Sequence, residues 1–138
     1  MRQTSLVPEF VVTVPDKLEP GKLYVSTRFR TASHLCACGC GNKVVTPLKP
    51  AKWHLTVENG LVSLSPSIGS WQLPCKSHYW ITENKVVWSR VFSEDEIKEV
   101  LERDAKDLHD YYADRQASRA NRKILARLWA WLRHKWDR

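Results

Sequence analysis

Four cysteines are the residues whose types and spacing most directly suggest a chemistry. Cys36, Cys38 and Cys40 fall within five residues, and Cys75 follows after a long insert. Such crowding disfavours disulfides, because adjacent bridges would be strained, and it favours thiolate ligation of a metal. Four soft ligands from two turns suit tetrahedral zinc. The sequence therefore predicts a structural Zn²⁺ site built from the four cysteines.

Two histidines lie close enough in sequence to compete for the ligand positions. His78 follows the last cysteine by three residues, and His34 precedes the first by two. Gly39 and Gly41 alternate with the cysteines, which suits a backbone that bends around an ion with positive φ. A buried cysteine-rich loop with free thiols is the alternative. The sequence does not separate a four-cysteine ligand set from one that exchanges a cysteine for His78.

The elements that must position these residues are read from short β-branched and aromatic runs separated by turn residues. Seven candidate strands lie at residues 10–14, 23–26, 43–46, 54–57, 61–64, 79–82 and 85–88. This pattern predicts a small, mostly antiparallel β domain over residues 1–92. Bulky aromatics in such a domain usually fill the core, so we expect Trp53, Trp71, Trp80 and Trp88 there.

The pattern changes at Ser93, which forms a capping box with Glu96 and precedes a run of helix formers. Apolar residues then recur at helical spacing over about 94–114 and again over about 118–136. We expect two helices packed as an antiparallel hairpin. The predicted fold class is therefore α+β, a zinc-binding β domain at 1–92 followed by a C-terminal helical extension at 93–138.

The net charge of +7 is distributed unevenly along the chain. Residues 1–92 carry a net +6, residues 93–114 a net −6 and residues 115–138 a net +7. The basic, Trp-rich last stretch could lie on an anionic membrane or bind nucleic acid. The interpretation we favour is a hairpin, within one chain or in a homodimer, that sets acidic against basic residues. No apolar run is long enough to span a bilayer and no leader is evident, so we expect a cytoplasmic protein.

Three segments carry a family resemblance: residues 34–48 (HLCACGCGNKVVTPL), 62–71 (VSLSPSIGSW) and 74–81 (PCKSHYWI). Together they resemble, over about residues 18–88, the bacterial family of unknown function catalogued as DUF6527. Ser70 stands where members often have Asn. The resemblance implies ubiquitin-like proteins and their E1-like and E2-like enzymes as partners. It also implies a peptidase activity on those ubiquitin-like proteins.

A serine peptidase needs a hydroxyl within hydrogen-bond reach of an imidazole. Ser67 lies in a tight turn near Gly69, whose N–H could stabilise an oxyanion, and His78 could be the base. His34 could orient or replace His78, or serve as a metal ligand. The alternatives are a structural Ser67 with a zinc-ligating His78, and a thiol peptidase that uses Cys40 with His78.

Three functions follow from these residues and the resemblance. The first is a zinc-stabilised peptidase that matures or deconjugates a ubiquitin-like protein, with Ser67 and His78 as catalytic residues. The second is a non-catalytic zinc adaptor for ubiquitin-like proteins or their conjugating enzymes. The third is a zinc protein that binds nucleic acid through its basic C-terminal stretch.

Overall fold

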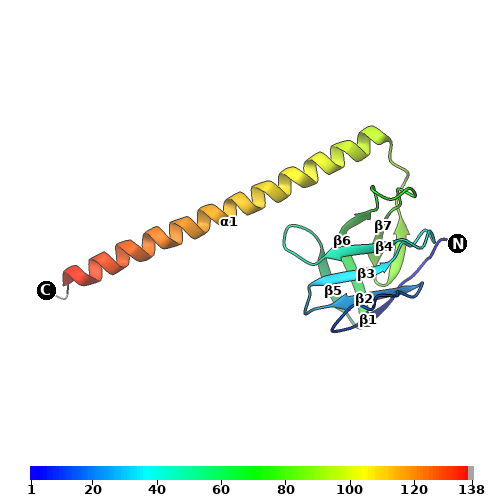
Figure 1. Ribbon diagram of the computed structural model, residues 1–138, viewed down its shortest axis with the longest axis horizontal. Helices are drawn as coiled ribbons and strands as arrows, with labels where there is room; N and C mark the ends of the chain where they lie inside the picture. Colours follow the sequence, from blue (N-terminus) through cyan, green and yellow to red (C-terminus); the bar gives the residue numbers. More distant parts are fainter. Residues whose placement is uncertain (137–138) are drawn as a thin grey trace. The chain divides into compact units, whose positions relative to one another are not determined.

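The structure, a computed structural model, describes residues 1–136, and the side chains of residues 1–133. Residues 137 and 138, the end of the predicted helical extension, lie outside the described part. In the described part of the chain, eight strands precede one helix, α1 (Glu94–Trp136). Figure 1 shows α1 as one unbroken helix. The strands are β1 (Val7–Phe10), β2 (Lys22–Ser26), β3 (Thr31–Leu35), β4 (Lys43–Pro47), β5 (His54–Glu58), β6 (Leu61–Gly69), β7 (His78–Thr82) and β8 (Lys85–Trp88). The α+β fold class is confirmed.

The strands form two four-stranded sheets, ordered β1-β2-β3-β4 and β5-β6-β7-β8. All neighbouring strands are antiparallel except the parallel pair β1 and β2. The sequence missed β3, because its Ala, Ser and His residues have weak strand preference. Its position between β2 and β4, with Ala32, Ser33 and His34 buried, makes it a strand.

Side chains from both sheets form one hydrophobic core. Strand alternation sends Leu23 and Val25 of β2 and Tyr79 and Ile81 of β7 into this core, all almost fully buried. Burying an apolar side chain of this size contributes roughly 1.5–3 kcal/mol. By the same alternation, the remaining β7 residues, His78, Trp80 and Thr82, share the other face of the strand.

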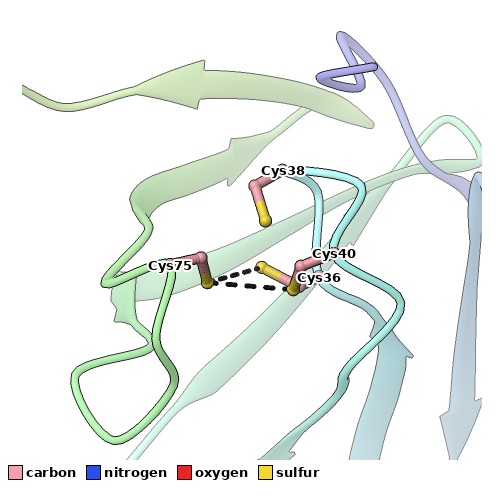
Figure 2. Close-up of side chains that lie close together, drawn as sticks. All are labelled: Cys36, Cys38, Cys40 and Cys75. Atoms are coloured by element: carbon pink, nitrogen blue, oxygen red, sulfur yellow. Dashed lines mark hydrogen bonds between the residues drawn. The ribbon is translucent and has the colours of Figure 1, made fainter.

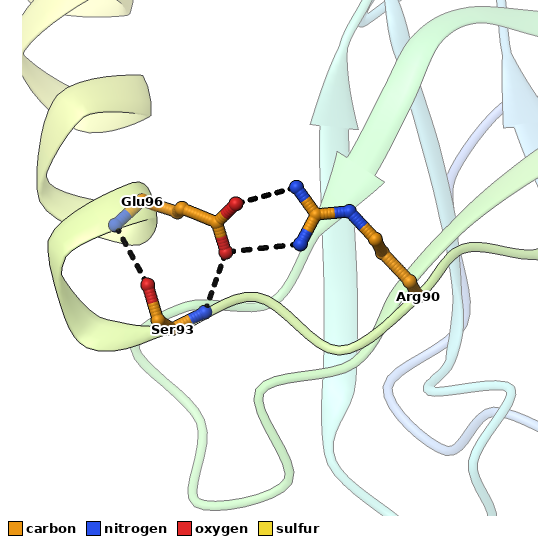
Figure 3. Close-up of polar contacts among 3 residues, drawn as sticks. All are labelled: Arg90, Ser93 and Glu96. Atoms are coloured by element: carbon orange, nitrogen blue, oxygen red, sulfur yellow. Dashed lines mark hydrogen bonds and ion pairs between the residues drawn. The ribbon is translucent and has the colours of Figure 1, made fainter.

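Helix α1 begins with the capping box that the sequence predicts. The backbone N–H of Ser93 donates to Glu96 Oε2 at 2.8 Å, and the N–H of Glu96 donates to Ser93 Oγ at 3.3 Å (Figure 3). Arg90 donates to both oxygens of the same carboxylate through its two terminal guanidinium nitrogens, Nη1 and Nη2. These contacts satisfy backbone donors that the first helical turn would leave without partners.

The predicted helical hairpin is wrong, because α1 is continuous from Glu94 to Trp136. The expected turn falls on Arg115, Gln116 and Ala117, which are good helix formers, and neither Gly nor Pro occurs nearby. Nothing there ends the backbone hydrogen-bonding pattern. The acidic and basic segments consequently follow one another along one helix instead of lying side by side.

The chain divides into two compact units, Met1–Ile97 and Lys98–Arg138. The first unit contains both sheets and the first turn of α1, and the second is the rest of the helix. No side chain from 98 to 133 is buried. Within the described residues, no helix has both the length and the apolar character needed to cross a membrane.

Candidate functional site

The four cysteines of the β-rich unit converge in one cluster (Figure 2). Cys36, Cys38 and Cys40 come from the loop after β3, and Cys75 comes from the loop before β7. The four Sγ atoms lie within 4.8 Å of one another. The Sγ of Cys75 is 3.8 Å from that of Cys36 and 3.8 Å from that of Cys40. The tertiary fold thus joins a ligand set that is 35 to 39 positions apart in sequence.

These sulfur distances fit a metal ion and do not fit disulfides. A tetrahedron with metal–sulfur bonds of about 2.3 Å has sulfur atoms about 3.8 Å apart, whereas a disulfide needs about 2.05 Å. All four thiols are free. The four cysteines could therefore hold a metal ion, and His78 is not one of the group.

The loop after β3 has the backbone conformation that a metal-binding turn requires. Gly39 and Gly41 adopt φ values of +86° and +79°, as the alternation of glycine and cysteine suggested. Hydrogen bonds from the backbone and side chain of Asn42 lower the pKa of Cys40 to about 6. Burial instead raises the pKa of Cys36 to about 12. A bound cation would stabilise the thiolate form of such a buried cysteine.

His34 lies on β3, buried, and outside the group of four cysteines. Its Nε2 is 2.7 Å from the Tyr79 hydroxyl, which also accepts the backbone N–H of Ala37 at 3.5 Å. Burial lowers the pKa of His34 to about 4, so the ring is neutral. His34 and Tyr79 thus support the cysteine loop from the core side.

Ser67 and His78 meet across the β6–β7 pair. Ser67 Oγ lies 2.8 Å from His78 Nε2. The register of the pair shifts between Leu64 and Ile68, so Ser67 falls within an irregular stretch of β6. Irregularities of this kind redirect side chains relative to regular pleating. The two residues proposed from the sequence as nucleophile and base are therefore in hydrogen-bonding contact.

Aromatic rings enclose the imidazole of His78. The ring centroids of Phe92, Trp71 and Trp80 lie 4.6, 4.9 and 5.2 Å from that of His78. Trp71 also stacks on Phe92, with centroids 5.4 Å apart. Burial, and then the positive charge of Arg90, lower the pKa of His78. The ring is consequently neutral near pH 7 and able to accept a proton.

His78 Nδ1 is buried and has no hydrogen-bond partner among the described residues. When the Ser67 hydroxyl donates to Nε2, the neutral ring carries its proton on Nδ1. A catalytic triad would place a carboxylate or amide oxygen there. In this structure the packing of Trp71, Trp80 and Phe92 orients the ring instead.

Gly69 lies on β6, the strand of Ser67, and packs directly against Trp71 of this aromatic enclosure. A Cβ at Gly69 would lie 2.2 Å from the indole of Trp71, so only glycine allows the indole to cover this strand. Gly69 pairs with His78, and the next backbone N–H, of Ser70, donates to Ser77 O at 2.8 Å. In the alternating antiparallel pattern, the Gly69 N–H therefore points away from β7.

The sequence interpretation missed the aromatic enclosure. Trp80 was expected in the core, but it is 38% exposed on the face it shares with His78. Trp53 and Trp88 do pack, partly buried, against the core. Strand alternation could have identified Trp80, because it lies two positions after His78. Phe92 and Arg90 follow the last strand and carry no comparable local signal.

Comparison with known proteins gives one family. Residues 10–89 match the family model described as "Bacterial ubiquitination-like system serine protease (BubE)". The designation differs from that of the family resembled by the three motifs, but the bacterial ubiquitin-like context is the same. No curated protein and no solved structure matches the chain.

Proposed function

The chain belongs to the family of serine proteases of bacterial ubiquitination-like systems, and from this premise we propose that Ser67 is its nucleophile and His78 its general base. The observation that carries the proposal is the 2.8 Å contact between Ser67 Oγ and His78 Nε2. A distance of this size allows direct proton transfer between the two atoms. The lowered pKa of His78 adds support, because only the neutral imidazole can take the proton.

The reaction follows from these two groups. Ser67 Oγ attacks the carbonyl carbon of the scissile bond while its proton passes to His78 Nε2. His78 then gives that proton to the leaving amine, and an acyl-serine ester remains. Water then attacks the ester carbonyl while the same nitrogen takes its proton. His78 returns that proton to Ser67 Oγ as the bond between the acyl carbon and Oγ breaks, which releases the acid and regenerates the serine. The N–H of Gly69 is a candidate donor to the oxyanion that forms in both steps.

The ring of His78 keeps its orientation without a third polar residue. Contacts with Trp71, Trp80 and Phe92 limit its rotation. They also exclude water from the Nδ1 side. We expect a Ser–His dyad to be slower than a full triad, since the imidazolium formed during the reaction lacks a facing carboxylate.

The substrate we propose is a ubiquitin-like protein, cleaved during maturation or deconjugation, with the E1-like and E2-like enzymes of the same system as partners. The cysteine cluster would hold Zn²⁺ in a structural role. Four thiolates leave no open coordination position, so the ion would act as a cross-link between the loops before β4 and before β7. This cross-link lies three residues from His78 and would fix the start of its strand.

The test is cleavage of a ubiquitin-like protein that carries a C-terminal extension. Ser67→Ala and His78→Ala should each lower kcat/KM by roughly a thousandfold or more. Ser65→Ala, on the same strand, should keep wild-type activity. Unchanged cleavage by Ser67→Ala would exclude the serine mechanism. Loss of cleavage in Cys40→Ala with metal still bound would favour a thiol mechanism.

One observation favours a second candidate, a non-catalytic adaptor. The buried Nδ1 of His78 has no acceptor among the described residues, and a protease normally provides one. An adaptor would bind a ubiquitin-like protein or a conjugating enzyme and leave the extension uncleaved. Equal binding by the wild type and Ser67→Ala, with no cleavage by either, would support it.

A further inference from the structure

The second half of α1, residues 115–133, has a charge pattern unlike that of any other segment. All of its ionisable side chains are cationic: Arg115, Arg119, Arg122, Lys123, Arg127 and Arg133. The preceding segment, residues 98–114, holds six acidic and three basic side chains. Because α1 is continuous, the acidic segment does not fold back on the basic one.

The cations and the large apolar side chains of this segment lie on opposite faces of the helix. At about 100° per residue, the six cations fall within an arc of roughly 140°. The large apolar side chains fall within a separate arc of roughly 160°. They are Ile124, Leu125, Leu128, Trp129, Trp131 and Leu132. Trp129 and Trp131 occupy the two edges of the apolar arc, next to the cations.

These apolar side chains are open to solvent in the structure. Their exposed fractions range from 41% for Leu132 to 64% for Trp129. Exposed apolar surface that is contiguous and bordered by polar residues commonly marks an interaction site. The segment therefore presents an exposed apolar surface, bordered by cations, that is available to a binding partner.

Three kinds of partner differ in how they would use the two faces. Nucleic acid would engage the cations and leave the leucines in water. A second copy of the helix would pack as a coiled coil, which buries apolar residues at only two positions of every seven. The apolar arc of this segment is wider than such a stripe. An anionic membrane would contact both faces of the helix. The apolar arc would enter the boundary between headgroups and acyl chains, and the cations would interact with the anionic headgroups. Trp at the edges of the arc suits the level of the headgroups.

We propose that residues 115–133 of α1 dock on the surface of an anionic phospholipid membrane, with the helix axis in the plane of the interface. The acidic segment, residues 98–114, would be repelled by the same surface, so contact is confined to the second half. This inference is independent of the peptidase proposal and concerns a different unit of the chain.

The experiment is sedimentation of the full chain with vesicles of phosphatidylcholine alone or of equal parts phosphatidylcholine and phosphatidylglycerol. We expect at least tenfold stronger binding to the anionic vesicles, weakening as salt rises. The double substitution Leu125→Ser with Leu128→Ser should lower this binding at least tenfold. Its matched control, Leu101→Ser with Leu108→Ser on the acidic half, should leave it unchanged.

Charge reversal gives a second pair of variants. Arg122→Glu with Arg127→Glu should remove most binding to anionic vesicles, whereas Lys98→Glu with Arg103→Glu changes the net charge equally and should have little effect. Circular dichroism would verify that all variants remain helical.

Three results would overturn the proposal. The first is equal binding to neutral and anionic vesicles, or no binding to either. The second is binding to duplex DNA, but not to vesicles, that survives the loss of Leu125 and Leu128. The third is that the chain does not bind vesicles but forms a dimer, and that the same leucine substitutions dissociate this dimer.

Discussion

Cys75 reaches Cys36 across 39 positions of sequence, whereas Lys98 of α1 reaches Glu102 across four. The same contrast separates the two units throughout. In the β-rich unit, Ser67 and His78 come from neighbouring strands, and His34 contacts Tyr79 from the other sheet. In α1 beyond Ile97, side chains three or four positions apart are the neighbours that matter.

Because their contacts differ in this way, the two units should tolerate different kinds of change. The candidate active site depends on the placement of single atoms, so one added methyl group can disrupt it. The surface of α1 depends on the pattern of charge and apolar character, so single substitutions should change it gradually.

The largest effect is expected from removing the metal ion that we propose the four cysteines hold. Cys75→Ser, or a strong chelator, should lower the Tm of the β-rich unit by roughly 10 °C or more, because a structural ion contributes several kcal/mol to folding. Helical signal should largely remain, since the hydrogen bonds of α1 are internal to it. Circular dichroism and metal analysis would measure both. Adding Zn²⁺ back to the chelated protein should restore its Tm, whereas Mg²⁺ should not. Loss of helical signal in parallel with the β-rich unit would show that the stability of α1 depends on that unit.

Gly69→Ala is expected to lower kcat/KM by roughly 10- to 100-fold with the metal still bound. The new Cβ would overlap the indole of Trp71, and Trp71 must then leave its place against His78. Trp71→Ala alone should also lower activity. The double variant should be no worse than Trp71→Ala, because the clash is gone. Additive losses would show that Gly69 acts by another route.

The pH dependence of cleavage tests the electrostatics of His78. The base must be neutral, so kcat/KM falls as pH drops through its pKa, and the lowered pKa puts this fall at a lower pH than for an ordinary histidine. Arg90→Gln removes a positive charge that disfavours the imidazolium. The pKa should rise and the acidic limb should move to higher pH.

The matched control for that experiment is Glu96→Gln. It removes the ion-pair partner of Arg90 and keeps the guanidinium charge, so the acidic limb should not move to higher pH. An equal upward shift in both variants would assign the effect to the loop before α1 and not to charge.

The smallest effect is expected at the start of α1. Ser93→Ala removes the hydroxyl that accepts the N–H of Glu96 and should cost about 1 kcal/mol locally. Hydrogen exchange should speed up at Glu94 to Ile97, while kcat/KM stays unchanged. Ser118→Ala, in the exposed middle of the helix, is the control and should change neither. Loss of cleavage in Ser93→Ala would show that the helix start positions the site.

Features that depend on residue type and short spacing could be predicted from the sequence alone. Crowded cysteines predicted the cluster, Ser93 and Glu96 predicted the capping box, and Gly39 predicted a turn with positive φ. The continuous helix was also encoded locally, because no Gly or Pro interrupts residues 98 to 133. The hairpin prediction was wrong because it gave more weight to charge complementarity than to the absence of Gly and Pro. Ser67 and His78 were chosen with the help of a family resemblance, and their catalytic roles stay a prediction.

Which distant groups come into contact depends on the tertiary structure. Strand pairing brings Ser67 Oγ to His78 Nε2, and the loop before β7 carries Trp71 over Gly69. It also leaves His78 Nδ1 enclosed by aromatic rings and without an acceptor among the described residues. Such contacts depend on register and on the packing of distant segments, which residue types do not specify. A shift of one residue in a strand would turn every side chain to the opposite face.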